Sequence, residues 1–144
     1  MSSLPRQSRS EKKIEYSTLV TLDQDDFDVA FFDRILERES GNIDVIRRQA
    51  ELLSKQGNHQ DALSLDRQLV ELLPKDKIVR YNLACSLALT SQVSAAVAEL
   101  RAAIELGYSD FARIESDSDL DVLRDNPEFI ALLDENQGDP FRLD

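Results

Sequence analysis

Cysteine is almost absent from this sequence: Cys85 is the only one, so the chain can form neither an internal disulfide nor a cysteine-rich zinc site. Glycine and proline occur four times each, tryptophan is missing, and aromatic residues make up 6% of the chain. A sheet-rich fold would need more turn residues and more aromatic and β-branched residues. These shortages, together with abundant Ala, Leu, Glu, Arg and Gln, favour a helical protein.

Long apolar runs are also missing. No segment approaches the length of a membrane span, and the amino terminus lacks the apolar stretch of a signal peptide. Acidic residues outnumber basic ones by 28 to 17, which gives the 144 residues a formal net charge of −11. An acidic body repels phosphate backbones. We therefore expect a protein of the cytoplasm that inserts into no membrane and binds no nucleic acid.

The chain divides into segments of different composition. Residues 1–13 are polar and basic, and we expect a disordered tail there. Residues 14–25 are expected to be a linker or a poorly defined segment, either extended or helical. Apolar residues then recur at helical spacing, which predicts a first helix over residues 26–40. The last residues, 136–144, are expected to form a C-terminal tail.

A repeat of 34 residues occupies the centre of the chain. The matched pairs are Ala50 and Ala84, Leu53 and Leu87, Gly57 and Ser91, Ala62 and Ala96, and Leu72 and Leu106. Two helices joined by a tight turn and recurring at this period are typical of a helical-hairpin solenoid. The small alanines would let the two helix axes approach to about 8–10 Å, and Pro74 would end the second helix.

Residues 43–76 and 77–108 resemble two successive tetratricopeptide repeats. The match is clearest in "YNLA" (Tyr81 to Ala84) and "AAIELG" (Ala102 to Gly107). The sequence departs from the family at Gln49 and Asp66, where apolar residues are preferred, and at Ser91, which replaces the turn glycine. The resemblance implies an all-α fold in which residues 26–135 form one domain, a right-handed superhelix of helical hairpins.

The stretch "DSDLDVLRDNPE" (residues 117–128) has the alternating acids of a calcium-binding loop. Val122 stands where that loop requires glycine for its sharp bend, which disfavours calcium.

Helix starts explain these acids better than a metal does. Ser118 and Asp121 have the spacing of a capping box, and Asn126 followed by Pro127 has the form of an N-cap and a first helical residue. Residues 109–135 also resemble the closing segment of many bacterial tetratricopeptide arrays. That resemblance implies a cap over the open end of the solenoid.

Motifs that carry chemistry are missing from the sequence. It has no glycine-rich phosphate loop, no zinc-ligand spacing and no nucleophile elbow, so we expect no enzyme, no metal and no cofactor. His59 follows Gly57 in a predicted turn and is expected to be solvated. Cys85 has no evident cation beside it to lower its pKa and is expected to be inert.

The resemblance implies that a partner binds on the concave surface, which the first helix of each hairpin lines. The expected lining residues are Asp44, Arg47, Arg48, Glu51 and Lys55 from the first repeat and Ile78, Tyr81, Asn82, Cys85 and Leu89 from the second. A peptide there would place apolar side chains against Tyr81 and an acid against Arg47 or Arg48. Glu51 stands where a clamp for a terminal carboxylate needs asparagine, which disfavours that ligand.

We therefore expect a non-enzymatic module that binds another protein as a scaffold or adaptor. One alternative is a dedicated chaperone or secretion escort, which would form a stoichiometric complex with a single client protein. Another is a structural subunit that self-associates as a homo-oligomer through an unpaired end of the solenoid.

Overall fold

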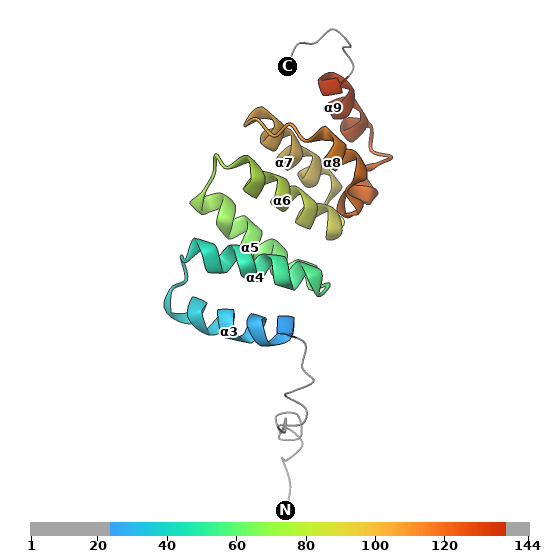
Figure 1. The fold of residues 1–144 in the computed structure, drawn as a ribbon. Helices are drawn as coiled ribbons and strands as arrows, with labels where there is room; N and C mark the ends of the chain where they lie inside the picture. The colour runs from blue at the N-terminus through green and yellow to red at the C-terminus, as the bar shows by residue number, and fades with distance from the viewer. Residues whose placement is uncertain (1–23, 138–144) are drawn as a thin grey trace, which may run out of the picture.

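The computed structural model describes residues 24–137, and every regular element in that range is helical (Figure 1). The helices are α3 (Gln24–Arg38), α4 (Ile43–Lys55), α5 (His59–Leu72), α6 (Lys77–Leu89), α7 (Val93–Glu105), α8 (Phe111–Ser116), the 3-10 helix η1 (Ser118–Leu123) and α9 (Pro127–Gln137). The predicted all-α fold is confirmed for these residues. No described helix combines the length and the apolar character that crossing a membrane requires. The tail predicted at 1–13, nearly all of the linker predicted at 14–25 and residues 138–144 lie outside the described residues.

Each helix packs mainly on its neighbours in the chain. Contacts join α3 to α4, α4 to α5, α5 to α6 and α6 to α7, and the segment that follows returns so that η1 contacts α6 and α7 while α9 contacts α7. In Figure 1 the helices form an elongated array with α3 at one end and α9 at the other. Helix α3 therefore has a helical neighbour on one side only among the described elements.

Three helices end in turns with the same backbone geometry. Gly57, Ser91 and Gly107 adopt positive φ values of 85°, 64° and 109°. In each turn the amide of the following residue donates to the carbonyl five residues earlier, as Asn58 to Leu53 at 2.8 Å, Gln92 to Leu87 at 2.8 Å and Tyr108 to Ala103 at 2.9 Å. This bonding is that of a Schellman motif. The turns at Gly57 and Ser91 are thus equivalent, as the 34-residue repeat predicts.

The repeated alanines lie in the core. Ala50, Ala62, Ala84 and Ala96 are each at most 5% exposed, in α4, α5, α6 and α7 respectively. These positions lie in the two helix pairs that the repeat predicts, and Pro74 follows directly after the C-cap of α5. The last matched pair behaves differently. Leu72 and Leu106 are 41% and 37% exposed, so these leucines mark equivalent surface positions rather than core.

Gln49, one of the departures from the family pattern, joins α3 to α4. Its Nε2 donates to the backbone oxygen of Val29 at 3.1 Å and to Oδ1 of Asp33 at 2.5 Å, and the side chain is 1% exposed. A buried polar group needs such partners, because an unbonded one costs about 1–3 kcal/mol. These two hydrogen bonds therefore help to hold α4 against α3, which has no buried residue of its own.

The acidic stretch begins helices, although one of the predicted caps is wrong. Asp117, not Ser118, caps η1 by accepting a hydrogen bond from the Asp119 amide at 3.0 Å. The predicted cap of α9 is confirmed, since Asn126 Oδ1 accepts from the amides of Glu128 and Phe129 at 2.9 and 3.0 Å and Pro127 is the first residue of the helix. The buried side chains of this segment join the core of α6 and α7; they are Ile114, Leu120, Leu123, Phe129 and Leu132.

Candidate functional site

A cleft of about 360 Å³ lies between α4 and α6. Helix α5 forms its floor, because Asp66 and Leu69, two of the α5 residues that line it, are 6% and 1% exposed. Side chains from α8 and η1 border it at the end nearest the cap. The lining residues are Arg47, Ala50, Glu51, Ser54, Lys55, His59, Asp66, Leu69, Asn82, Cys85, Ser86, Arg113 and Asp119.

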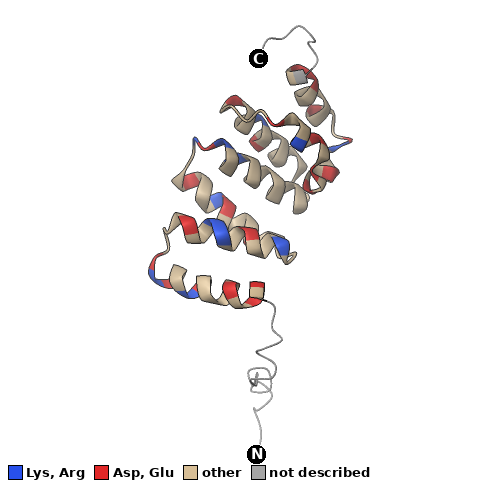
Figure 2. Cartoon of the chain, viewed as in Figure 1, with Lys and Arg blue, Asp and Glu red and all other residues tan. Residues whose placement is uncertain are grey.

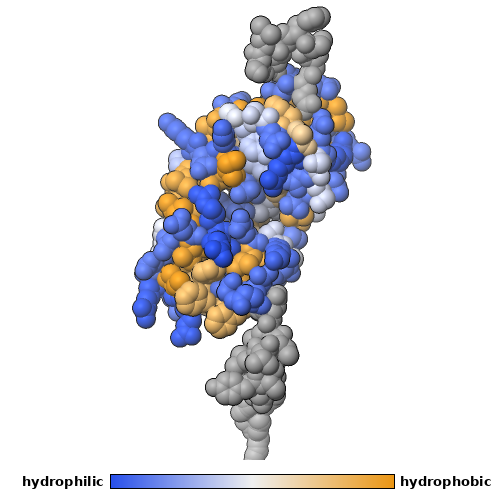
Figure 3. Space-filling model, in the orientation of Figure 1, coloured by the Kyte–Doolittle hydropathy of each residue, from blue (hydrophilic) through white to orange (hydrophobic). Residues whose placement is uncertain are grey.

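Five of the predicted site residues line this cleft together: Arg47, Glu51, Lys55, Asn82 and Cys85. Their helices differ in character. Acidic and basic residues are interspersed along α4, whereas most of α6 is uncharged (Figure 2). In Figure 3, hydrophilic residues gather around the centre of the face that is seen. At these positions the first helices of the two repeats thus contribute to one surface.

Tyr81 does not line an open groove, contrary to the prediction. It is 2% exposed, its ring stacks on Tyr108 with centroids 4.5 Å apart, and its hydroxyl donates to Asp117 Oδ2 at 2.6 Å. The Arg113 guanidinium lies over the same ring at 5.5 Å. Residues 109–135, the closing segment, thus cover this part of α6, so Tyr81 anchors that segment and is not available to a partner.

Other predicted residues lie beside the cleft or away from it. The guanidinium of Arg48 sits 5.4 Å from the centroid of the Phe32 ring of α3. Ile78 is 46% exposed at the start of α6 and does not line the cleft, and neither does the exposed Asp44. Leu89 borders a separate hollow with Gly57, Asn58 and Thr90. Asp44, Arg48, Ile78 and Leu89 lie on the predicted helices. The direction in which each side chain points, however, depends on neighbours that the repeat pattern does not specify.

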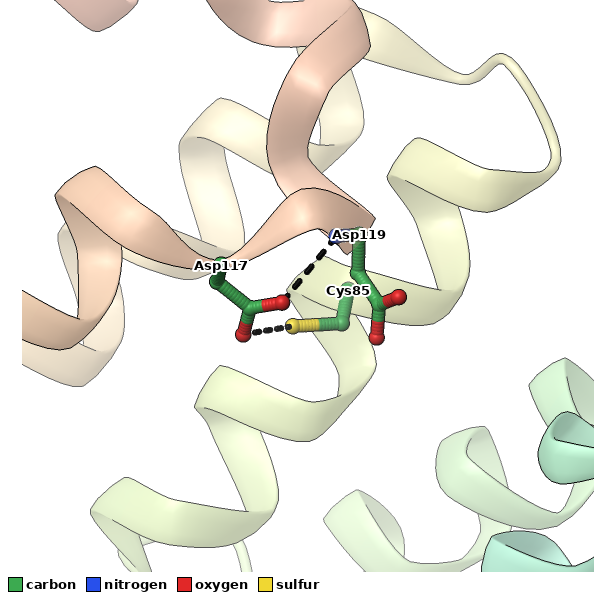
Figure 4. A group of neighbouring side chains, drawn as sticks. All are labelled: Cys85, Asp117 and Asp119. Carbon is green, nitrogen blue, oxygen red and sulfur yellow. Dashed lines mark hydrogen bonds between the residues drawn. The ribbon is translucent and has the colours of Figure 1, made fainter.

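Cys85, Asp117 and Asp119 form a compact group at the edge of the cleft, which Cys85 and Asp119 line, with their potential ligand atoms within 4.8 Å of one another (Figure 4). Both carboxylate oxygens of Asp117 already have partners. Oδ1 accepts from the Asp119 amide, and Oδ2 accepts from Tyr81 and, at 3.8 Å, from the Cys85 thiol. A cation here would have to compete with the bonds that hold the cap, so we assign this group a structural role.

Burial keeps the Cys85 thiol protonated. Its pKa is raised, first by burial and then by the nearby carboxylates of Asp117 and Asp119. Since the thiolate is the nucleophilic form, this environment opposes reactivity. The pKa of Asp119 is also raised, by burial and by the negative charge of Asp117.

Asp66 is a buried acidic residue that lines the cleft. Ser86 Oγ donates to its Oδ2 at 2.5 Å, while its Oδ1 accepts no hydrogen bond from a described residue. Burial raises the pKa of Asp66 to about 6, and the Ser86 hydrogen bond opposes that rise only in part. The sequence marked this residue as a departure from the family but gave no sign that it would face a cavity.

The basic groups that border the cleft differ in how far they are neutralised. Lys55 forms an ion pair with Asp25 of α3 at 2.8 Å, and Arg113 lies 3.6 Å from Asp117. Arg47 has no ion pair or hydrogen bond within residues 24–137, which leaves its guanidinium available to a ligand.

His59 also differs from its prediction. It is the first residue of α5, it is half-buried, and its Nδ1 atom is buried without a hydrogen-bond partner in the described part of the chain. The predicted solvated loop position is therefore wrong.

Comparison with known proteins gives one partial relationship. The chain is similar to a chloroplastic protein of Arabidopsis thaliana, with 35% identity over 89 residues that cover 60% of this chain and 27% of that protein. The chain thus spans about a quarter of the length of this relative. No family model matches the chain. No solved structure matches it either.

Proposed function

We propose that this chain is a non-enzymatic interaction module that holds a segment of another protein in the cleft between α4 and α6, as a scaffold or adaptor. The observation that carries the proposal is the cleft itself. Arg47, which pairs with no other group in residues 24–137, and the partly buried Asn82 face this cavity from two helices. We further propose that the helices belong to a tetratricopeptide-like right-handed superhelix. The equivalent turns at Gly57 and Ser91 and the buried alanines support that arrangement.

The chemistry of the cleft suits an extended polypeptide. Amide and hydroxyl groups from Asn82 and Ser54 can bond to a peptide backbone, and Arg47 can accept an acidic side chain. Ala50 and Leu69 supply apolar contact between these polar groups. Concave sites with a few convergent polar groups are typical of ligand binding. The buried, protonated Cys85 offers no nucleophile, which favours binding over catalysis.

Affinity capture from native lysate with a charge-reversed cleft tests this function. Arg47→Glu changes a cleft residue, while Arg67→Glu makes the same change on the exposed surface of α5 outside the cleft. We expect the wild type and Arg67→Glu to recover the same partners, and Arg47→Glu to recover at least tenfold less, as quantified by mass spectrometry. Equal recovery by both variants would contradict the proposal. Circular dichroism and thermal melting would verify that both variants fold.

The number of captured proteins separates the scaffold from the escort. A scaffold recovers several proteins at different stoichiometries, whereas an escort recovers one client in a fixed ratio.

Self-association has a specific observation in its favour. Phe27 and Phe31 are 57% and 51% exposed, and they belong to α3, which lies at one end of the array (Figure 1). Exposed aromatic side chains at such an end are candidates for contact with a second copy. Light scattering at two concentrations, with Phe27→Ser/Phe31→Ser beside the wild type, tests this alternative. A molar mass that rises with concentration only in the wild type would support it, and a constant monomer mass would refute it.

For location, we propose the cytoplasm. The similar protein of Arabidopsis thaliana is named as chloroplastic, which makes the chloroplast the alternative. Immunoblots of fractionated cells distinguish the two compartments.

A further inference from the structure

We propose that the cleft anchors its partner by a lysine or arginine side chain that reaches down to the Asp66 carboxylate. This inference rests on the proposed function and adds the chemistry of recognition. It differs from the sequence-based expectation, which paired an acidic side chain of the partner with arginines of α4.

The position of Asp66 carries the argument. Its side chain is 6% exposed yet lines the cleft, and one of its oxygens has no hydrogen bond from a described residue. The oxygen without a donor is not among the fully enclosed atoms, so it is open to the cleft, where a cation within hydrogen-bond distance would stabilise the carboxylate. The described residues supply no such cation, since neither ion pairs nor hydrogen bonds join Asp66 to a basic side chain there.

The surroundings of Asp66 fit a long basic side chain in particular. Ala50 and Leu69 give the cleft apolar contact surface near its floor, which suits the methylene stem of lysine or arginine. Glu51 and Asp119 add negative charge along the same cleft. The positive charges of Lys55 and Arg113 are offset by Asp25 and Asp117.

Two other occupants fit less well. A metal ion needs several ligand atoms close together, and within residues 24–137 the potential ligand group is Cys85, Asp117 and Asp119, which does not include Asp66. An acidic side chain at the floor would be repelled by Asp66, although Arg47 at the side of the cleft can receive one. The structure thus favours a partner segment with a basic residue at the floor and an acidic residue nearby.

A pair of small probes tests the proposal directly. N-acetyl-arginine N-methylamide carries the guanidinium group, and N-acetyl-citrulline N-methylamide is its neutral counterpart of nearly the same shape. Each is titrated into the ¹⁵N-labelled full chain at pH 7.5 while amide chemical shifts are followed by NMR. We expect the arginine probe to shift the amides of Asp66, Asn82 and Ser86 in a saturable manner. The citrulline probe is expected to bind at least tenfold more weakly than the arginine probe. Nα-acetyl-lysine N-methylamide is titrated in the same way, and the tighter binder of the two basic probes identifies the preferred group.

Three variants complete the test. Asp66→Asn removes the charge and is expected to weaken the arginine probe at least tenfold, while Asp61→Asn makes the same change on an exposed position of α5 and is expected to leave binding unchanged. Ser54→Arg places a basic side chain in the cleft without altering Asp66, and we expect it to block the probe. This variant keeps the test decisive if Asp66→Asn disturbs folding.

The outcomes separate the two proposals. Equal binding of the arginine and citrulline probes, undiminished binding to Asp66→Asn, or shifts confined to other surfaces would overturn the basic anchor. If the probe fails while capture from lysate still depends on Arg47, the anchor is wrong and the interaction module stands. If the probe binds at Asp66 while capture is indifferent to Arg47, the cleft recognises a cation but the proposed function is wrong.

Discussion

Replacement of the buried Asp66 by asparagine is expected to stabilise the protein at neutral pH and to have no such effect in acid. The pKa of Asp66 is about 6 in the folded protein and 3.8 in the absence of burial. The folded state therefore binds the proton more tightly, and the contribution of Asp66 to stability falls as the pH rises from about 4 to about 6. Because the pKa in the folded protein lies about two units above the ordinary value, the ionised carboxylate lowers the free energy of unfolding by ~3 kcal/mol at pH 7.5.

Urea unfolding of wild type and Asp66→Asn between pH 4 and pH 8 measures this effect. The amide oxygen of asparagine can still accept the hydrogen bond from Ser86, so the comparison isolates the charge. We expect the variant to unfold at higher urea above pH 6, and the difference to vanish near pH 4. Asp61→Asn, at an exposed position of the same helix, is expected to change stability by less than about 0.5 kcal/mol throughout. A difference for Asp66→Asn that is constant with pH would refute the claim that a buried charge is the cause.

Two further predictions concern stability. Ser91 holds a positive φ of 64° that glycine adopts freely, so Ser91→Gly is expected to raise the free energy of unfolding by ~1 kcal/mol and Gly57→Ser to lower it similarly; equal melting temperatures for both variants and the wild type would contradict this. Tyr81→Phe removes the hydroxyl that donates to Asp117 and is expected to lower the free energy of unfolding by ~1–3 kcal/mol. A double-mutant cycle with Asp117→Asn measures the coupling, and additive effects would show that the hydrogen bond does not secure the cap.

Much of the fold follows from local patterns in the sequence. The spacing of Ala50 and Ala84, the glycine or serine at the turns, and Pro74 after α5 each have a local physical reason, and the structure agrees with them. The cap of α9 was equally predictable, because Asn126 and Pro127 act on adjacent residues.

The candidate site was predictable only in part, because it depends on contacts between distant segments. The repeat pattern places Tyr81 on the first helix of a hairpin, but only the folded closing segment, through Asp117 and Arg113, decides that its ring is covered. Asp66 is a similar case. Its polar character was visible as a departure from the repeat, whereas its place at the floor of a cleft depends on how α4 and α6 lie over α5.

In the closing segment, residues 109–135, Arg124 makes contacts that the sequence also did not predict. Its guanidinium donates to the backbone oxygens of Ile114 and Asp117 at 3.1 and 2.8 Å, which ties α8 to η1. No sequence motif identifies such a contact, because the carbonyls that it satisfies lie in the last turn of α8 and at its C-cap, ten and seven residues earlier in the chain.

Site-specific photocrosslinking in native cells tests the binding cleft most directly. A photoreactive phenylalanine analogue placed at Asn82 lies in the cleft, and the same analogue at Arg67 lies on the exposed surface of α5 outside it. A discrete crosslinked partner from position 82 that is absent from position 67 is the result we predict. Crosslinks to that partner from position 67 alone, or equally from both positions, would contradict binding between α4 and α6.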